Sequence, residues 1–194
     1  MNKRVMKYNP AFLSADELLE NFVVRHAELD LIMQTLRENT GDSNQHLLLI
    51  GPRGIGKTML VLRAVEAVRR HKKLATQWYP LVFSEESYQV TTPGEFWLEA
   101  IFHLAQKTDD PRWNAAHEEL HQETNETRLR ERALAQLLDL ADAQNKRLLL
   151  VVENLNMLLG EQMADDDGWA LRHTLLNEPR LMPVSYTHLR AHET

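Results

Sequence analysis

The fold follows from one stretch of sequence, Gly51-Pro52-Arg53-Gly54-Ile55-Gly56-Lys57-Thr58, which matches the pattern G-x-x-x-x-G-K-[ST] at every fixed position. The apolar run 46–50 comes directly before it and predicts a buried strand. Residues 59–68 come directly after it and predict a helix. The order strand, glycine-rich loop, helix is the local structure that this motif requires.

The residue types in this stretch suit the binding of phosphate. Glycine adopts backbone angles that other residues avoid, so consecutive N–H groups can turn toward one anion. The N-terminus of the following helix points its partial positive charge at the same place. Lys57 is expected to reach the β- and γ-phosphates of a nucleotide, and the Thr58 hydroxyl to bind Mg²⁺. The plainer alternative is a glycine-rich turn with an exposed lysine.

A nucleotide site of this kind predicts ATP and Mg²⁺ as cofactors. The Asn145-Lys146 pair is not followed by Asp two residues later, so a guanine-specific Asn-Lys-x-Asp motif is absent and adenine is favoured. The residues expected to bind the nucleotide are Gly51, Pro52, Arg53, Gly54, Ile55, Gly56, Lys57, Thr58 and Met59.

Length and composition indicate a cytoplasmic α/β domain. The chain has 194 residues, enough for one domain with a substantial core. Its formal net charge of −6 does not indicate binding to nucleic acid or to a membrane surface. It has no cysteine, which excludes disulfides and thiolate sites, and no apolar run approaches the roughly twenty residues of a membrane span.

The hydrophobic pattern along the chain alternates between helices and strands. Ser14 and Glu17 have the spacing of a capping box and predict a helix start. A strand is expected over 76–83, although Pro80 makes its middle uncertain. Residues 147–153 predict a strand apolar on both faces, as in a central parallel strand. Further helices are expected over 25–37, 92–107, 112–122, 127–143 and from 166 to about 177, and a last strand is expected to begin at 180–182.

Glu153, at the end of the apolar strand 147–153, is the second residue expected to take part in chemistry. A phosphate loop of this type works with an acid at the end of a neighbouring strand, which holds the Mg²⁺. The strand ends Val151-Val152-Glu153-Asn154, so a single acid is present. Either Glu153 holds the metal and Asn154 occupies the position of a catalytic base, or Glu153 is the base and Val152 occupies the metal position. The plainer alternative is a charged residue that ends a strand.

Three segments together resemble the AAA+ ATPases, specifically the origin-recognition-like and STAND-like group. They are the box Phe22-Val23-Val24-Arg25-His26-Ala27-Glu28-Leu29, the Walker A motif 48–58, and residues 148–153 as Walker B. The first box departs from the usual pattern at Val24, where glycine is common. The resemblance implies a P-loop NTPase three-layer sandwich with a parallel central sheet. It also implies Lys57 and Glu153 as catalytic residues, and Thr58 and Glu153 as metal ligands.

The expected domain covers residues 1–183, with a helical N-terminal segment at 11–40, the P-loop core from 46 and a helical insertion at about 111–125. Residues 184–194 resemble a translated adapter sequence and are expected to be a non-native tail. His188 and His192 in it have helical i, i+4 spacing but no third ligand, so a metal site is rejected. The sensor residue, arginine finger and helical lid that the resemblance implies would lie beyond this sequence.

The function expected is to bind ATP with Mg²⁺ and to couple binding, and hydrolysis, to a conformational change in a larger assembly. A protein partner, or self-association through the AAA+ module, is expected, with no membrane. Two alternatives remain open. One is a nucleotide-gated switch in signalling or defence with little turnover. The other is a helper ATPase of DNA remodelling or transposition, which would contact nucleic acid only through a downstream domain.

Overall fold

A computed structural model describes residues 13–39, 45–83 and 90–188 of the chain. The basic N-terminus, part of the expected polar loop before the first strand, and the end of the expected tail lie outside these residues. Among the helices described, none is long and apolar enough to cross a membrane.

Four parallel strands form the central sheet. They are β1 (Leu47–Gly51), β2 (Trp78–Val82), β3 (Arg147–Glu153) and β4 (Leu181–His188). Their order in the sheet is β1-β4-β3-β2, so β1 and β2 are the edge strands. Strands that run parallel need a crossover between them, which the intervening helices supply. The expected P-loop NTPase fold with a parallel sheet is therefore confirmed.

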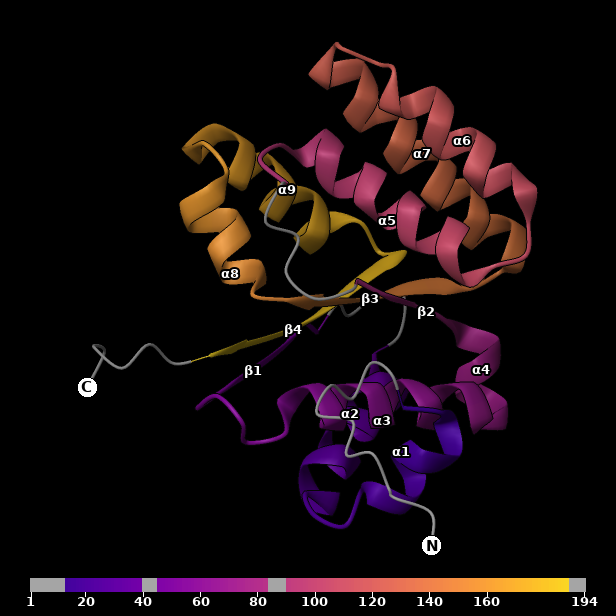
Figure 1. The fold of residues 1–194 in the computed structure, drawn as a ribbon, viewed down its shortest axis with the longest axis vertical. Coiled ribbons are helices and arrows are strands. Elements are labelled where there is room, and N and C mark those ends of the chain that lie inside the picture. Colours follow the sequence, from indigo (N-terminus) through magenta and orange to yellow (C-terminus); the bar gives the residue numbers. More distant parts are fainter. Residues whose placement is uncertain (1–12, 40–44, 84–89, 189–194) are drawn as a thin grey trace, which may run out of the picture.

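Helices cover both faces of the sheet and make three layers (Figure 1). One face carries α1 (Ala15–Asn21), α2 (His26–Glu38), α3 (Lys57–Arg70) and α4 (Lys72–Gln77). The other carries α5 (Pro93–Lys107), α6 (Pro111–His121), α7 (Glu126–Gln144), α8 (Leu155–Met157), the π-helix η2 (Leu158–Gln162) and α9 (Asp165–Asn177). The helical insertion expected near 111–125 is α6, which packs against α5.

The two faces of β3 divide the core into two clusters. Successive side chains of a strand point to opposite faces. Accordingly, Leu148, Leu150 and Val152 pack with α5, α7 and α9. Leu149 and Val151 pack with α2 and α3 on the other face. Glu153 continues the second series and therefore points to the α3 side of the sheet.

Two helix starts follow the chemistry expected of them. The Ser14 hydroxyl accepts from the Glu17 N–H, and the Glu17 carboxylate accepts from the Ser14 N–H, which confirms the capping box of α1. Thr92 and Glu95 form the same reciprocal pair at α5. Such caps satisfy N–H groups that the first turn of a helix leaves without partners.

The second strand begins later than its composition predicts. Residues 72–77 form α4, because the His71 side chain accepts a hydrogen bond from the Leu74 N–H and caps a short helix. The strand then starts at Trp78 and includes Pro80. Proline cannot donate to a neighbouring strand, and β2 is an edge strand, where this is tolerated.

The last strand extends further than expected. It begins at Leu181, close to the predicted start, and runs through His188, beside both β1 and β3. Residues 184–187 are buried in the sheet. A fold describes how a segment packs and not where it came from, so the foreign origin of 184–194 stays a prediction.

Candidate nucleotide site

The loop between β1 and α3 has the backbone that the glycines predict. Gly54 and Gly56 have positive φ angles of 80° and 88°. A Cβ atom at either position would meet nothing within 4 Å. The requirement for glycine is therefore one of backbone angle rather than of space. Gly56 is also the N-cap of α3, so the loop ends at the positive end of that helix.

Lys57 is buried at the first position of α3. Its Nζ donates to the Gly51 and Pro52 carbonyl oxygens at 2.7 Å and 2.9 Å. Burial lowers the pKa of Lys57, while the charge of Glu153 raises it and that of Arg25 lowers it further. The carbonyl oxygens are neutral, so they orient the ammonium without cancelling its charge.

Glu153 lies at the carboxyl end of β3, on the side of the sheet that carries Lys57. The Tyr186 hydroxyl donates to its Oε2 at 3.3 Å. Thr58, half-buried, is the second residue of α3. Among the described residues, no three His, Asp or Glu side chains gather into a metal site. A hydroxyl and one carboxylate fit Mg²⁺ bound to a nucleotide, because Mg²⁺ takes few protein ligands beside phosphates and water.

Comparison with known proteins identifies this arrangement. Residues 21–186 match the family of the AAA ATPase domain. The chain belongs to this family. The fold is also similar to that of PCH-2 from C. elegans, with a TM-score of 0.54 and 11% sequence identity. The similarity covers 93% of this chain and 42% of that protein, so the chain spans less than half of PCH-2. No curated protein matches the chain.

Within the AAA ATPase domain, the surroundings of Glu153 bear on the two possible alignments of its Walker B strand. The Val152 side chain is 1% exposed and packs on the opposite face of the sheet, away from Lys57. Asn154 has a positive φ of 52°, and its Oδ1 accepts from the Thr187 hydroxyl at 3.1 Å. Glu153 is thus the acid of this strand end that acts on Lys57, and Asn154 follows it at the turn into α8.

Arg25 is a residue of this AAA ATPase domain that the sequence did not single out. It is the N-cap of α2 and has a positive φ of 66°. Its charge acts on Lys57, which places it at the phosphate-binding loop. The positive φ falls on Arg25 and not on Val24, among the described residues. The absence of glycine at 24 therefore causes no backbone strain, and Arg25 in the box 22–29 was the available signal.

Proposed function

We propose that the chain binds ATP with Mg²⁺ through residues 51–59. The observation that carries this is the glycine-turned loop, which ends at Lys57 on the N-terminus of α3 and on the Glu153 side of the sheet. Residues 51–59, of which all but Pro52 have a backbone N–H, surround the phosphates, and Lys57 neutralises the β- and γ-phosphates. When the nucleotide binds, the Lys57 ammonium exchanges its hydrogen bonds to carbonyl oxygens for hydrogen bonds to phosphate. A charged phosphate compensates the hydration that the ammonium lost on burial more fully than neutral carbonyl oxygens do.

Thr58 and Glu153 are the proposed ligands of the Mg²⁺ that accompanies the nucleotide. When bound, this ion bridges phosphate oxygens and neutralises charge that develops on them. The Tyr186 hydroxyl is placed to orient the Glu153 carboxylate. The orientation of Glu153 toward Lys57 supports its role as the metal-holding acid, with Asn154 in the position of a catalytic base.

This alignment has a consequence for hydrolysis. A carboxamide does not accept a proton from water at neutral pH, so turnover is expected to be slow. Asn154→Glu supplies the missing base and is expected to raise the rate of phosphate release by about tenfold or more. Asn154→Ala is the control, because alanine, like glutamate, fits this positive φ angle less well than asparagine does and supplies no base. An Asn154→Glu variant that is folded and no faster than wild type contradicts the alignment.

The proposed output is a conformational change within a protein assembly in the cytoplasm.

An exposed apolar surface supports association. We call it the β1–α9 surface, and it consists of Leu48 and Ile50 on β1 and Trp169 and Leu176 on α9, each at least half exposed. Leu48 and Leu176 line one cavity of about 200 Å³ with mostly apolar walls. Apolar groups gathered on a surface in this way are typical of protein-binding sites. Analytical ultracentrifugation with and without ATP measures self-association.

Two other functions keep the same nucleotide site. A signalling or defence switch would bind ATP tightly and release little phosphate, which the Glu153-Asn154 pair favours. A helper ATPase of DNA remodelling or transposition would carry a DNA-binding domain downstream. The full-length gene separates these, since a helix-turn-helix module supports the second and a long repeat array the first.

A phosphate-release assay with a parallel ATP-binding titration tests the proposal. Lys57→Ala should weaken ATP binding by about a hundredfold and remove phosphate release at ATP concentrations that saturate wild type. Glu153→Gln should retain binding and lose release, because the metal is no longer held by a charge. Lys72→Ala, at an exposed position of α4, is the matched control and should change neither. Phosphate release that survives Lys57→Ala would overturn the proposal, whereas tight binding without Lys57-dependent release would favour the switch.

A further inference from the structure

A second cavity lies beside the edge strand β2, with a volume of about 310 Å³. Its walls come from the C-terminal ends of α3 and α5, from the first four residues of β2 and from Lys146, just before β3. This places it at the edge of the sheet opposite β1, toward the amino ends of the strands. The phosphate-binding loop follows the carboxyl end of β1. The two sites are therefore separate.

The cavity gathers positive charge. Arg69, Lys107 and Lys146 line it, and no Asp or Glu is among its described lining residues. Arg69 forms an ion pair with Glu66 at 2.7 Å, outside the lining. Arg69, Tyr79 and Lys107 all line this space. Burial raises the pKa of Tyr79 and the charge of Arg69 opposes that shift, whereas burial and then Arg69 lower the pKa of Lys107.

Lys107 is the residue most affected by this environment. Although its side chain as a whole is exposed, its Nζ lies against the Val82 carbonyl oxygen at 2.5 Å. Burial of the ammonium, and then the charge of Arg69, lower the pKa of Lys107 to about 8. An anion in the cavity would remove both penalties, because it would supply the charge and the hydrogen bonds that burial takes away.

The edge of β2 is a poor place for an added peptide strand. The Phe83 N–H donates to Val151 in β3, so the alternate residues 78, 80 and 82 present their backbone groups outward. The Trp78 N–H donates to the Leu74 carbonyl, and the Val82 carbonyl accepts from Lys107. Pro80 has no N–H to offer. The row of outward backbone groups is therefore interrupted at residues 78, 80 and 82, which disfavours an added peptide strand and favours a small molecule.

We propose that this cavity binds a phosphate monoester of a small organic molecule. Lys107, Lys146 and Arg69 supply charge for a phosphate, which carries between one and a half and two negative charges at neutral pH. Leu104 and Pro80 supply an apolar wall for the organic part. The volume is near the lower end of small-molecule pockets, about 300–1,000 Å³. Because Arg69 is already paired with Glu66, a carboxylate would compensate one of the two lysines and leave the other uncompensated.

The test follows Lys107 directly. Lysines of the full chain are reductively ¹³C-methylated, and the Lys107 resonance is assigned by its loss in Lys107→Arg. Inorganic phosphate and glucose 6-phosphate are then titrated in separate experiments. Saturable shifts of the Lys107 resonance are expected, with glucose 6-phosphate binding several-fold more tightly. The pKa of Lys107 should rise by about one unit in the complex.

Two variants make the result specific. Lys146→Gln should weaken binding by about tenfold, the loss of one charge-assisted hydrogen bond, without changing the fold. Lys57→Ala should leave the titration unchanged, which separates this site from the nucleotide site. The proposal is overturned if the Lys107 resonance does not saturate, if it shifts no more than the exposed Lys72, or if Lys57→Ala abolishes the effect. Equal affinity for the two probes would overturn the assignment of a monoester.

Discussion

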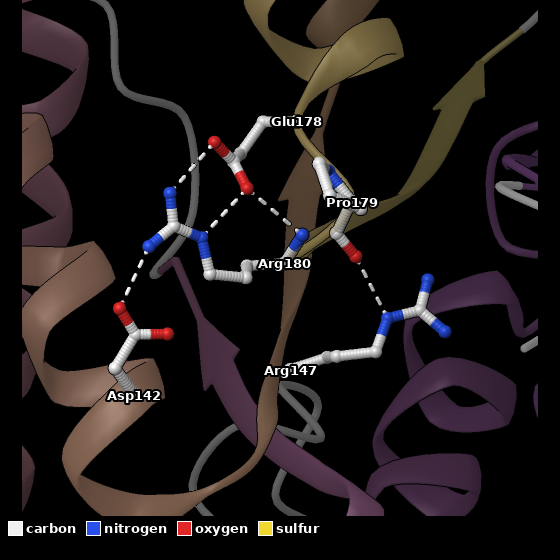
Figure 2. Close-up of polar contacts among 5 residues, drawn as sticks. All are labelled: Asp142, Arg147, Glu178, Pro179 and Arg180. Atoms are coloured by element: carbon white, nitrogen blue, oxygen red, sulfur yellow. Dashed lines mark hydrogen bonds and ion pairs between the residues drawn. The ribbon is translucent and has the colours of Figure 1, made fainter. Parts of the chain in front are cut away.

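The two ends of the parallel sheet use their charges differently. At the amino ends, Arg180 is held by Glu178 at 2.7 Å and by Asp142 at 2.8 Å, while Arg147 donates to the Pro179 carbonyl at 2.8 Å (Figure 2). At the carboxyl ends, Lys57 is oriented by carbonyl oxygens beside a loop of glycines.

The difference separates the charges of Arg180 and Arg147, which hold the fold, from the charge of Lys57, which we propose serves a ligand. Carboxylates neutralise the Arg180 guanidinium, whose pKa is raised above its usual value by the hydrogen bond to Glu178. Such pairs fix the turn between α9 and β4. The Lys57 ammonium donates to neutral carbonyl oxygens at the N-terminus of α3, and the charge of Glu153 acts on it as well. Mutations at the two ends should therefore fail in different assays.

The largest effect is expected at the carboxyl end. Lys57→Ala should weaken ATP binding by about a hundredfold, since the loss of one buried charge-assisted contact to phosphate costs about 2–3 kcal/mol. The melting temperature should not fall, because the ammonium loses hydration on burial. Titration of a fluorescent ATP analogue and thermal melting measure the two quantities. A Lys57→Ala variant with a lower melting temperature and unchanged ATP affinity would show that Lys57 holds the fold and does not serve the ligand.

Arg147→Leu should give the opposite pattern. The guanidinium lies 4.4 Å from the centre of the Trp78 ring and donates to the Asn39 and Pro179 carbonyls. Its removal should lower the free energy of unfolding by about 2 kcal/mol and leave ATP affinity unchanged. Chemical denaturation measures this, with Arg128→Gln on the exposed surface of α7 as control. Equal stabilities of the two variants would show that the contacts of Arg147 contribute nothing.

A smaller effect is expected from the backbone of the loop. Gly56→Ala places a side chain at a φ of 88° and should cost about 1 kcal/mol in stability, with weaker ATP binding. Gly160→Ala is the matched control, since a Cβ meets nothing within 4 Å at either position and Gly160 has no positive φ. The control should be neutral or slightly stabilising. Identical losses in both variants would show that the positive φ angle of Gly56 is not the cause of the loss.

The smallest effect concerns pH at the amino end. The hydrogen bond from Arg180, against a smaller effect of burial, lowers the pKa of Glu178 below 4.5. A carboxylate with a lowered folded pKa contributes stability above its unfolded pKa and loses it as pH falls through the folded one. Wild type should therefore be more stable than Glu178→Gln at pH 7, and the gap should close as the pH falls from the ordinary glutamate pKa of about 4.3 through the lowered folded pKa. A gap that stays constant across this range would exclude the ion pair as its source.

Local chemistry made much of this molecule predictable from sequence. The strand before Gly51, the helix after Gly56, the helix that begins near Thr92 and the buried strand 147–153 depend on neighbours in the chain, and all four are present. The strand before Gly51 was expected to be buried, which is wrong, because β1 is an edge strand and exposes Leu48 and Ile50. The order of the strands is different in kind. That β4 lies between β1 and β3 depends on contacts more than a hundred residues apart, from Leu47 to Val184 for example.

The candidate site divides in the same way. The loop 51–58 could be named because its residues are consecutive, whereas Glu153 required an inference across the sheet. Arg25 was missed because its strained angle is imposed by the entry into α2 and its effect on Lys57 crosses the fold. The cavity at β2 was not predictable, since it joins Arg69, Lys107 and Lys146 from three separate elements.

Pro80 has a consequence for how many copies of this chain can join through their sheets. Copies can join edge to edge into a long array only if each copy has two open sheet edges. The row of backbone groups along the β2 edge is interrupted, because Pro80 has no N–H, the Trp78 N–H is bonded to Leu74 and the Val82 carbonyl is bonded to Lys107. In the part of the sheet that the structure describes, β1 is the other edge strand. Pairing through these described strands would therefore join two copies at their β1 edges more readily than it would build a continuous fibre.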